Sequence, residues 1–483
     1  MNATLAVPGT AALQPWADLG AEPDAERLRE ALQRSMPQCN AGEWTITELR
    51  LSKVRRSSSK SRHPNPISMC IDLDLRESSS GRILVQRLYA KAYRNGASAQ
   101  AFSAALQDLL VAPPVGSAVL HVASLDMVLW AWPNDPSLPQ LAVLTDRQRL
   151  AGHLAQTQAW ADVGVHSVEV LRYEPERRAT LRCELNAIRA GQPGLVAFGK
   201  TFADDKAQAL QERFQSFWRL AGSDEQAPAV AEPLGWDPAT RTLWQAQAKG
   251  IPLLALVNST PADAVAPPGL TLHALSKLSP SGAGQAALEE LERTGRALAC
   301  LHLCALPVST SRSTDYWINE VRLRVQKISR AAPELKLAAQ KLAGLLEGAA
   351  EQAPRACQTL IHGDFHPEQV WVDGARIVFF DFDEFASGNP MEDLAEFIVK
   401  LEQCAASGSH QCSAQVQAFV NGYREAQPKF FDANWLQWHK AVQTLLQASR
   451  SFIYQQPGWR VLMAERLQTS LGLASSMHDK ANP

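Results

Sequence analysis

The segment from Thr359 to Glu396 places three oxygen-bearing side chains around a predicted β-hairpin. Asp364 follows a short apolar run and a His-Gly pair, which predicts a tight loop just past the end of a strand. Residues 370–380 alternate as two strands, and an Asp-Gly pair in the middle predicts a two-residue turn. Gln369 precedes this hairpin and Asp381 follows it, so the hairpin is expected to return Asp381 to the loop that carries Asp364.

These side chains have the types and the spacing that phosphoryl transfer requires. The reaction needs a carboxylate that orients the attacking hydroxyl and two oxygen ligands that hold magnesium against the phosphates. In protein kinases the base Asp lies five residues before a metal-binding Asn, and a second metal-binding Asp follows the next hairpin. The order here predicts Asp364 as the catalytic residue and Gln369 and Asp381 as the metal ligands.

One motif consists of His362, Gly363, Asp364 and His366, followed by a strand that ends at Asp381. It resembles the signature of the aminoglycoside phosphotransferase and choline kinase-like family. That family has Asn where this chain has Gln369, whose amide oxygen lies one methylene further out. Magnesium tolerates little distortion of its octahedral geometry, so this position is where the chain departs from the pattern. The resemblance implies transfer of the ATP γ-phosphoryl group, with Mg2+, to a hydroxyl of a small molecule.

The resemblance also implies an α+β, protein-kinase-like, two-lobed fold. An antiparallel-sheet N-lobe is expected over residues 151–250, and a mainly helical C-lobe with the catalytic loop over 251–483. An extra N-terminal α/β domain is expected over residues 1–150. The order strand-strand-strand-helix-strand-strand occurs over residues 44–132 and again over 165–247, which indicates a weak internal duplication. The first domain is therefore predicted to be a degenerate copy of the N-lobe.

Each copy carries one lysine in its third strand, Lys91 in the first and Lys200 in the second. In kinases a strand lysine holds the phosphates of the nucleotide, and a carboxylate on the following helix holds the lysine. The second copy offers Glu212 on that helix, whereas the first offers only Asp108 near the helix end. Lys200 and Glu212 are therefore predicted to bind the nucleotide, and Lys91 is assigned to the degenerate copy.

The turn from Glu174 to Ala179 takes the place of the phosphate-covering loop, and it contains no glycine. It resembles a segment rich in arginine that many bacterial family members have at this place. Arg177 and Arg178 are candidates for contacts with phosphate oxygens, because a guanidinium group binds them in a fork. The alternative is a hairpin turn with two solvent-exposed arginines. The basic loop from Arg55 to His63 takes the matching place in the first copy and is predicted to be a solvated loop.

Charge and hydropathy argue against several classes of partner. The net charge of −2 gives no general attraction to nucleic acid or to a membrane surface. No apolar run approaches the length of a membrane span, and the N-terminus lacks the basic start and apolar core of a signal peptide. The cysteines are scattered without a C-x-x-C pair, which favours a reduced, cytoplasmic protein.

Simpler interpretations are favoured for several other polar residues. Cys300, His302 and Cys304 have spacing that invites a metal site, but the surrounding apolar sequence favours a buried helix. Asp383 is predicted to be a solvated turn residue and Asp393 to cap the helix that begins at Met391 or the next residue.

Two other function classes remain open at this stage. One is a catalytically weak or inactive kinase-fold protein with a binding or regulatory role, for which the Gln at position 369 would mark lost metal geometry. The other is a protein kinase, against which the absence of an A-P-E motif after Asp381 counts. The acceptor, whether sugar, aminoglycoside or amino alcohol, and the oligomeric state are not readable from the sequence.

Overall fold

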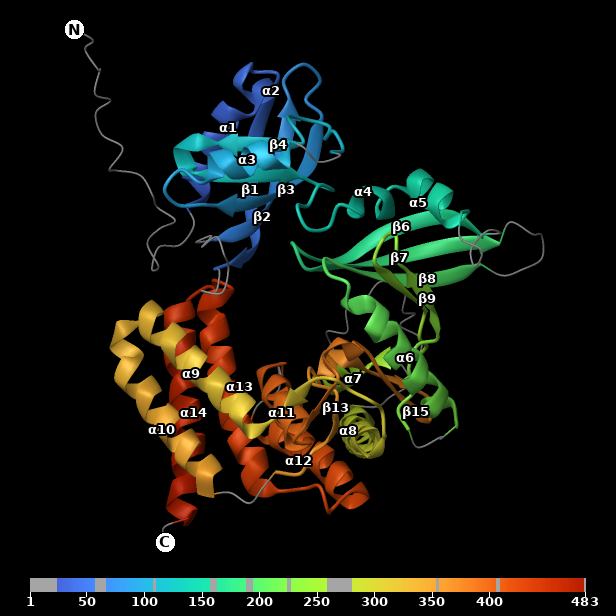
Figure 1. Cartoon of the computed structure of the whole chain (residues 1–483), viewed down its shortest axis with the longest axis vertical. Coiled ribbons are helices and arrows are strands. Elements are labelled where there is room, and N and C mark those ends of the chain that lie inside the picture. The colour runs from blue at the N-terminus through green and yellow to red at the C-terminus, as the bar shows by residue number, and fades with distance from the viewer. Residues whose placement is uncertain are drawn as a thin grey trace. The chain divides into compact units, whose positions relative to one another are not determined.

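The computed structural model describes residues 24–56, 67–106, 110–156, 163–187, 194–223, 227–258, 280–352, 356–404 and 409–481 (Figure 1). The chain divides into two compact units. Unit 1 contains Met1–Asp205, Asp237–Thr242 and Ser451–Trp459, and unit 2 contains Lys206–Trp236, Leu243–Arg450 and Arg460–Pro483. The predicted basic loop lies outside the described residues from position 57 onward.

The first sheet is antiparallel throughout and has the strand order β1-β2-β3-β5-β4. Its face packs on the first helix, because Leu28 and Leu32 of that helix share a buried core with Ile71, Leu73 and Leu88. The elements of this part are α1 (Ala25–Ser35), α2 (Pro37–Asn40), β1 (Trp44–Arg55), β2 (Ser68–Glu77), β3 (Ile83–Ala92), α3 (Ser98–Ala105), β4 (Val119–Val122) and β5 (Met127–Ala131).

The second five-stranded sheet repeats this topology, with the order β6-β7-β8-β10-β9. In both sheets a helix is inserted between the third and fourth strands, as the sequence pattern predicts. Two short helices, α4 (Leu141–Leu144) and α5 (Arg147–Leu154), precede the second sheet. Its own elements are β6 (Val163–Glu174), β7 (Arg178–Ala187), β8 (Leu195–Phe202), α6 (Lys206–Ser223), β9 (Pro233–Asp237) and β10 (Thr242–Ala246).

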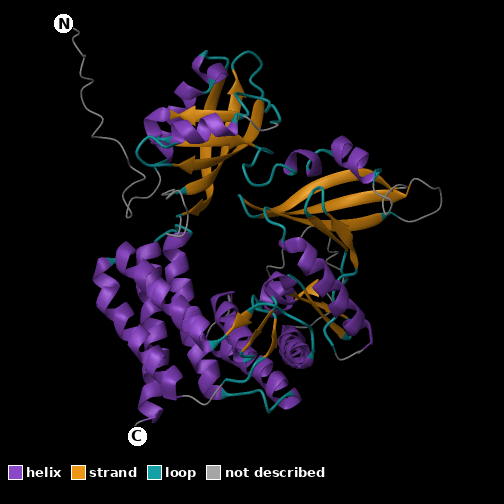
Figure 2. Ribbon diagram, viewed as in Figure 1, coloured by secondary structure: helices purple, strands orange, loops and turns teal. Residues whose placement is uncertain are grey.

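Most of unit 2 is helical, as the purple ribbons of Figure 2 show. The helices are α7 (Leu253–Val257), α8 (Pro280–Leu303), α9 (Thr314–Ala331), α10 (Lys336–Gln352), α11 (Met391–Cys404), α12 (Ser409–Ala426), α13 (Ala433–Ile453) and α14 (Trp459–Ala481). Two small sheets carry the predicted catalytic segment. One has the order β11 (Ile251–Pro252), β14 (Val370–Asp373), β15 (Arg376–Phe379), and the other β12 (Ser311–Arg312), β16 (Ala386–Gly388), β13 (Thr359–Ile361).

Glycines allow the backbones of α8 and α12 to approach closely. A Cβ atom at Gly295 would lie 2.2 Å from the carbonyl oxygen of Phe419, and one at Gly422 would lie 2.0 Å from that of Glu292. Any side chain at these positions would force the helices apart. The close contact fixes the C-terminal half of α8, which carries His302.

The predicted antiparallel-sheet lobe and helical lobe are confirmed, with two local corrections. The helix after β3 ends at Ala105, before Asp108, which lies outside the described residues. The hairpin turn consists of Gly374 and Ala375 rather than Asp373 and Gly374, because Asp373 pairs with Arg376 in the β14–β15 ladder. The left-handed residue in this turn is Gly374, with φ of 55°. No helix in the described part of the chain is both long and apolar enough to cross a bilayer.

Candidate active site

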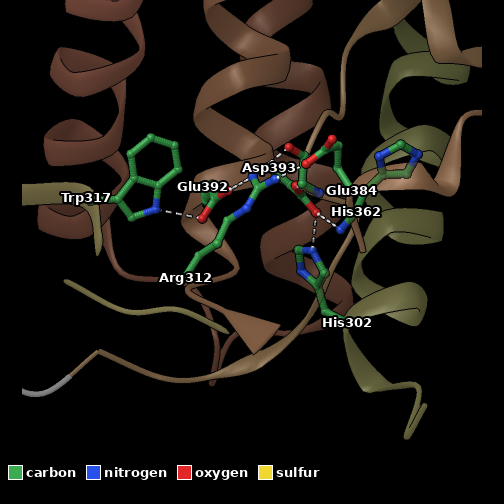
Figure 3. A network of polar contacts seen from close by, with 8 residues as sticks. His302, Arg312, Trp317, His362, Glu384, Glu392 and Asp393 are labelled. Carbon is green, nitrogen blue, oxygen red and sulfur yellow. Dashed lines mark hydrogen bonds and ion pairs between the residues drawn. The ribbon is translucent and has the colours of Figure 1, made fainter. Parts of the chain in front are cut away.

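A buried carboxylate holds the backbone of the predicted catalytic loop. The loop leaves β13 at His362, and the backbone N–H groups of His362 and Gly363 donate to the two oxygens of Asp393, at 2.7 and 2.8 Å. Asp393 lies in the first turn of α11 and is fully buried (Figure 3). Because both oxygens accept from consecutive amides, the carboxylate fixes the orientation of the peptide planes just before Asp364.

Two further helices support this carboxylate. His302 on α8 lies 3.0 Å from an oxygen of Asp393 through Nε2, and its Nδ1 lies 2.8 Å from the hydroxyl of Tyr423 on α12. With Nε2–H donating to Asp393, Nδ1 accepts from Tyr423. Burial alone would raise the pKa of Asp393, but the hydrogen bonds and charges from His302, His362 and Gly363 outweigh it and lower that pKa. Asp393 is therefore ionised at neutral pH.

Arg312 ties the same loop to two other acidic residues. Its Nη1 donates to the carbonyl oxygen of Gly363 at 2.7 Å and to Glu392 at 2.6 Å, and its Nη2 donates to Glu384 at 2.9 Å. The indole N–H of Trp317 completes the cluster by donating to Glu392 at 2.8 Å (Figure 3). Gly363 has φ of +81°, and a Cβ there would lie 2.3 Å from the carbonyl oxygen of Glu384. Only glycine fits this position.

The hairpin brings the two predicted metal ligands together, as expected from the sequence. Nε2 of Gln369 donates to Oδ2 of Asp381 at 3.2 Å, and the backbone N–H of Phe380 donates to the carbonyl of Gln369 at 3.0 Å. Asp381 adopts the left-handed conformation, with φ of 62°. Nε2 of Gln369 also lies 3.3 Å from Nε2 of His366. Burial lowers the pKa of His366, although the charge of Asp364 opposes this, so a neutral ring accepts from Gln369.

A second buried carboxyl group lies near the predicted base. Glu396 on α11 is only 4% exposed. Burial, and then the negative charge of Asp364, raise the pKa of Glu396 to about 8, while Arg450 acts in the opposite direction. Glu396 is therefore protonated at neutral pH.

The predicted nucleotide residues fall in both units. Lys200 lies on β8 in unit 1, opposite Thr180 of β7, and its Nζ lies 5.6 Å from the ring centroid of Phe202. Glu212 is exposed on α6 in unit 2. The ion pair between Lys200 and Glu212 stays a prediction.

The two turn arginines share one carboxylate. Arg177 and Arg178 each lie 3.3 Å from an oxygen of Glu174, which Arg172 also contacts at 2.7 Å. Burial would raise the pKa of Glu174, but the three arginines lower it, Arg178 most strongly. Arg177 and Arg178 are thus both paired with a carboxylate of their own turn. A role in binding phosphate stays a prediction.

Sequence reasoning assigned Asp393 wrongly and missed most of its neighbours. The side chain that caps α11 is Asn389, which accepts from the backbone N–H of Met391 at 3.0 Å. Asp393 points inward instead. The buried helix predicted around His302 is confirmed, and the described residues contain no cluster of three or more His, Cys, Asp or Glu suited to a metal. The residues that went unnoticed are Arg312, Trp317, Glu392, Glu396 and Tyr423.

A family comparison supports the motif over the same part of the chain. Residues 242–432 match the model of the phosphotransferase enzyme family. The match includes the whole catalytic segment from β13 to α11, and it confirms the resemblance drawn from the motif. No curated protein matches the sequence.

Several solved structures are similar to this chain at low sequence identity. A thermostable aminoglycoside phosphotransferase APH(4)-Ia, in a ternary complex with ADP and hygromycin B, has 13% identity and a TM-score of 0.45 and covers 68% of this chain and 98% of its own. A choline/ethanolamine kinase family protein from Mesorhizobium loti has 17% identity and a TM-score of 0.43, covering 68% and 94%. A glucosamine kinase with glucosamine, ADP and phosphate has 14% identity and a TM-score of 0.39, covering 95% and 100%. These TM-scores are low, so the functional proposal rests on the family match and on the residues of the site.

Proposed function

We propose that this protein transfers the γ-phosphoryl group of ATP, with Mg2+, to a hydroxyl group of a small molecule of the sugar, aminoglycoside or amino alcohol type. The observation that carries the proposal is the contact between Gln369 and Asp381 beside a loop that a buried carboxylate holds in place. The family match over the same residues supports it. A cytoplasmic location stays a prediction from the scattered cysteines.

The side chains at the hairpin fit a magnesium ion. Mg2+ prefers oxygen ligands and usually takes one or two from the protein, with phosphates and water supplying the rest. Asp381 offers a carboxylate and Gln369 a carboxamide next to it. A half-turn of the Gln369 amide about its terminal bond exchanges its nitrogen for its oxygen on the side of Asp381. When bound, the ion would neutralise charge on the phosphates of the nucleotide.

The chain's own residues would then position the reactants. Asp364 orients the acceptor hydroxyl and accepts its proton. Asp393 binds the two backbone amides before Asp364, so the backbone that carries the Asp364 carboxylate is held in one position. Lys200 is the candidate for binding phosphate oxygens, and Glu212 is the carboxylate that the sequence predicts as its partner. Arg177 and Arg178 contact the phosphates from the turn between β6 and β7.

The test is acceptor-dependent release of ADP. The full chain is incubated with ATP, magnesium and representatives of the three acceptor classes, and the phosphorylated product is identified by mass spectrometry. Loss of a general base lowers the rate by about 10²- to 10⁴-fold, so Asp364→Asn is expected to reduce kcat by that factor. Asp373→Asn is the matched control, because Asp373 is exposed on the same hairpin. Undiminished transfer by Asp364→Asn would refute the assignment.

A further inference from the structure

The lysine assigned to the degenerate copy contacts the other sheet. Nζ of Lys91 lies 2.8 Å from Oε1 of Glu176, in the turn between β6 and β7. The hydroxyl of Tyr89, two residues earlier on β3, donates to Oε2 of the same carboxylate at 2.7 Å. The side chains of Lys91 and Glu176 are only 15% and 27% exposed. All of these residues belong to unit 1. Two side chains of the first sheet thus bind the carboxylate in the turn of the second sheet.

A second carboxylate holds the same turn through its backbone. The N–H of Glu176 donates to Oδ2 of Asp135 at 2.9 Å, and the hydroxyl of Tyr173 donates to the same oxygen at 2.6 Å. Oδ1 of Asp135 accepts from the backbone N–H groups of Ser137 and Leu138, at 2.8 and 3.0 Å. Asp135 is buried, and its hydrogen bonds to Ser137 and Leu138 fix it to the segment that links the two sheets.

The backbone of Glu176 requires such anchors. Its φ is +57°, a left-handed conformation that a residue with a Cβ rarely adopts. Such a conformation persists where surrounding contacts over-determine it. Here both the side chain and the N–H of Glu176 are fixed, the first by Lys91 and Tyr89 and the second by Asp135.

Apolar packing joins the two sheets beside these polar contacts. Tyr173 and Ala179, which flank the turn, share a buried cluster with Cys70, Tyr89 and Trp130 of the first sheet. The rings of Tyr89 and Trp130 stack with centroids 5.9 Å apart. The turn therefore contacts the first sheet through Glu176 at its tip and packs against it through Tyr173 and Ala179 at its ends.

The turn is also the neighbour of the predicted phosphate-binding lysine. The backbone N–H of Ala203 donates to the carbonyl of Arg177 at 2.9 Å, and Thr180 just after the turn pairs with Lys200. We propose that the N-terminal domain positions this turn for the triphosphate of ATP through the contact of Lys91 and Tyr89 with Glu176. This inference rests on the proposed function, in which the turn and Lys200 bind the phosphates. Lys91 and Tyr89 are then positioning residues that do not touch the nucleotide.

The test compares two basic residues on one strand of the full chain. Lys91→Met removes the contact with the turn, whereas Arg87→Met removes an ion pair with Asp72 on β2, at 2.7 Å, within the first sheet. Coupled residues commonly show interaction energies that correspond to about tenfold in an equilibrium constant, so Lys91→Met is expected to raise the Kd of Mg-ATP and its KM by about that factor. The kcat at saturating ATP falls less, Lys91→Arg restores binding, and Arg87→Met leaves it unchanged.

A double variant and an exchange measurement complete the test. Combining Lys91→Met with Glu176→Gln should weaken binding no further than either change alone, because both remove one contact. Hydrogen exchange of the amides of residues 176–178 should accelerate in Lys91→Met and not in Arg87→Met. A folded Lys91→Met protein with normal ATP affinity and unchanged exchange would overturn the inference. If the unmodified chain binds no ATP, the proposed function fails, while faster exchange in Lys91→Met would still establish the anchoring of the turn.

Discussion

Replacing Asp393 with asparagine tests whether this buried carboxylate organises the catalytic loop. The variant keeps one side-chain oxygen but puts an NH₂ group where the second oxygen accepts a backbone amide or His302. One buried N–H then faces another donor, and the charge that strengthens all three hydrogen bonds is lost. The shape of the side chain is otherwise unchanged, so the effect is electrostatic.

The size of the effect follows from these contacts. A hydrogen bond to a charged group contributes about 1.5–3 kcal/mol net, and a buried donor left without an acceptor costs about 1–3 kcal/mol. We expect Asp393→Asn to lower the free energy of unfolding of unit 2 by about 3 kcal/mol, against about 0.5 kcal/mol or less for the exposed control Asp373→Asn. Because the pKa of Asp393 is lowered in the folded protein, its contribution is present above the unfolded pKa near 3.8 and is lost as pH falls through the folded pKa.

The assay must report on the loop itself, since a chain with two compact units need not unfold in one step. Hydrogen exchange of the peptide that contains His362 and Gly363, followed with urea unfolding between pH 3 and 8, separates the loop from the rest. The difference between the original chain and the variant should shrink below about pH 3.8. A loss under about 1 kcal/mol at pH 7, with unchanged exchange at the two amides, would refute the reasoning.

Three further predictions follow from the same site. Gly363→Ala should lower the free energy of unfolding by at least about 2 kcal/mol and abolish activity, because the new methyl group meets the Glu384 carbonyl at 2.3 Å. Gly374→Ala, where φ is positive but the space is open, should lower it by about 1 kcal/mol. Equal losses for the two variants in urea unfolding would contradict this. Since the pKa of Glu396 is raised from 4.5 to about 8, the chain should lose stability as pH rises through that range, by at most about 1.4 kcal/mol per pH unit, and Glu396→Gln should lack that slope in chemical unfolding. Gln369→Ala should increase the magnesium concentration needed for half-maximal transfer more than it lowers kcat, and a magnesium titration with the same midpoint as the original chain would exclude the ligand role.

The strands and turns could be predicted because their signals lie in neighbouring residues of the sequence. Alternation of apolar residues predicts the strands of both sheets. The Asp373–Gly374 pair predicts the tight turn of the hairpin that precedes Asp381. The one-residue error in that turn arises because Asp373 is equally acceptable as the last ladder residue or as the first turn residue. The ladder hydrogen bonds decide between them, and these depend on the partner strand.

The support of the loop could not be predicted because it comes from distant segments. Asp393 stands near the start of a helix, where a carboxylate ordinarily caps the helix, and only the tertiary structure turns it toward the amides of His362 and Gly363. Arg312 reaches the loop through the parallel pairing of β12 with β16, a contact between residues more than seventy positions apart. Similarly, the strand position of Lys91 gave no sign that its partner would be Glu176, eighty-five residues away.

Calorimetric titration of ATP into the full chain tests the central claim most directly, when it is done with magnesium, with chelator and in the Asp381→Asn variant. The account predicts binding with magnesium that weakens when the ion is removed, and a variant whose affinity no longer responds to magnesium. Equal affinity under all three conditions, or no binding by the original chain, would contradict the assignment of Gln369 and Asp381 as the magnesium site of a phosphotransferase.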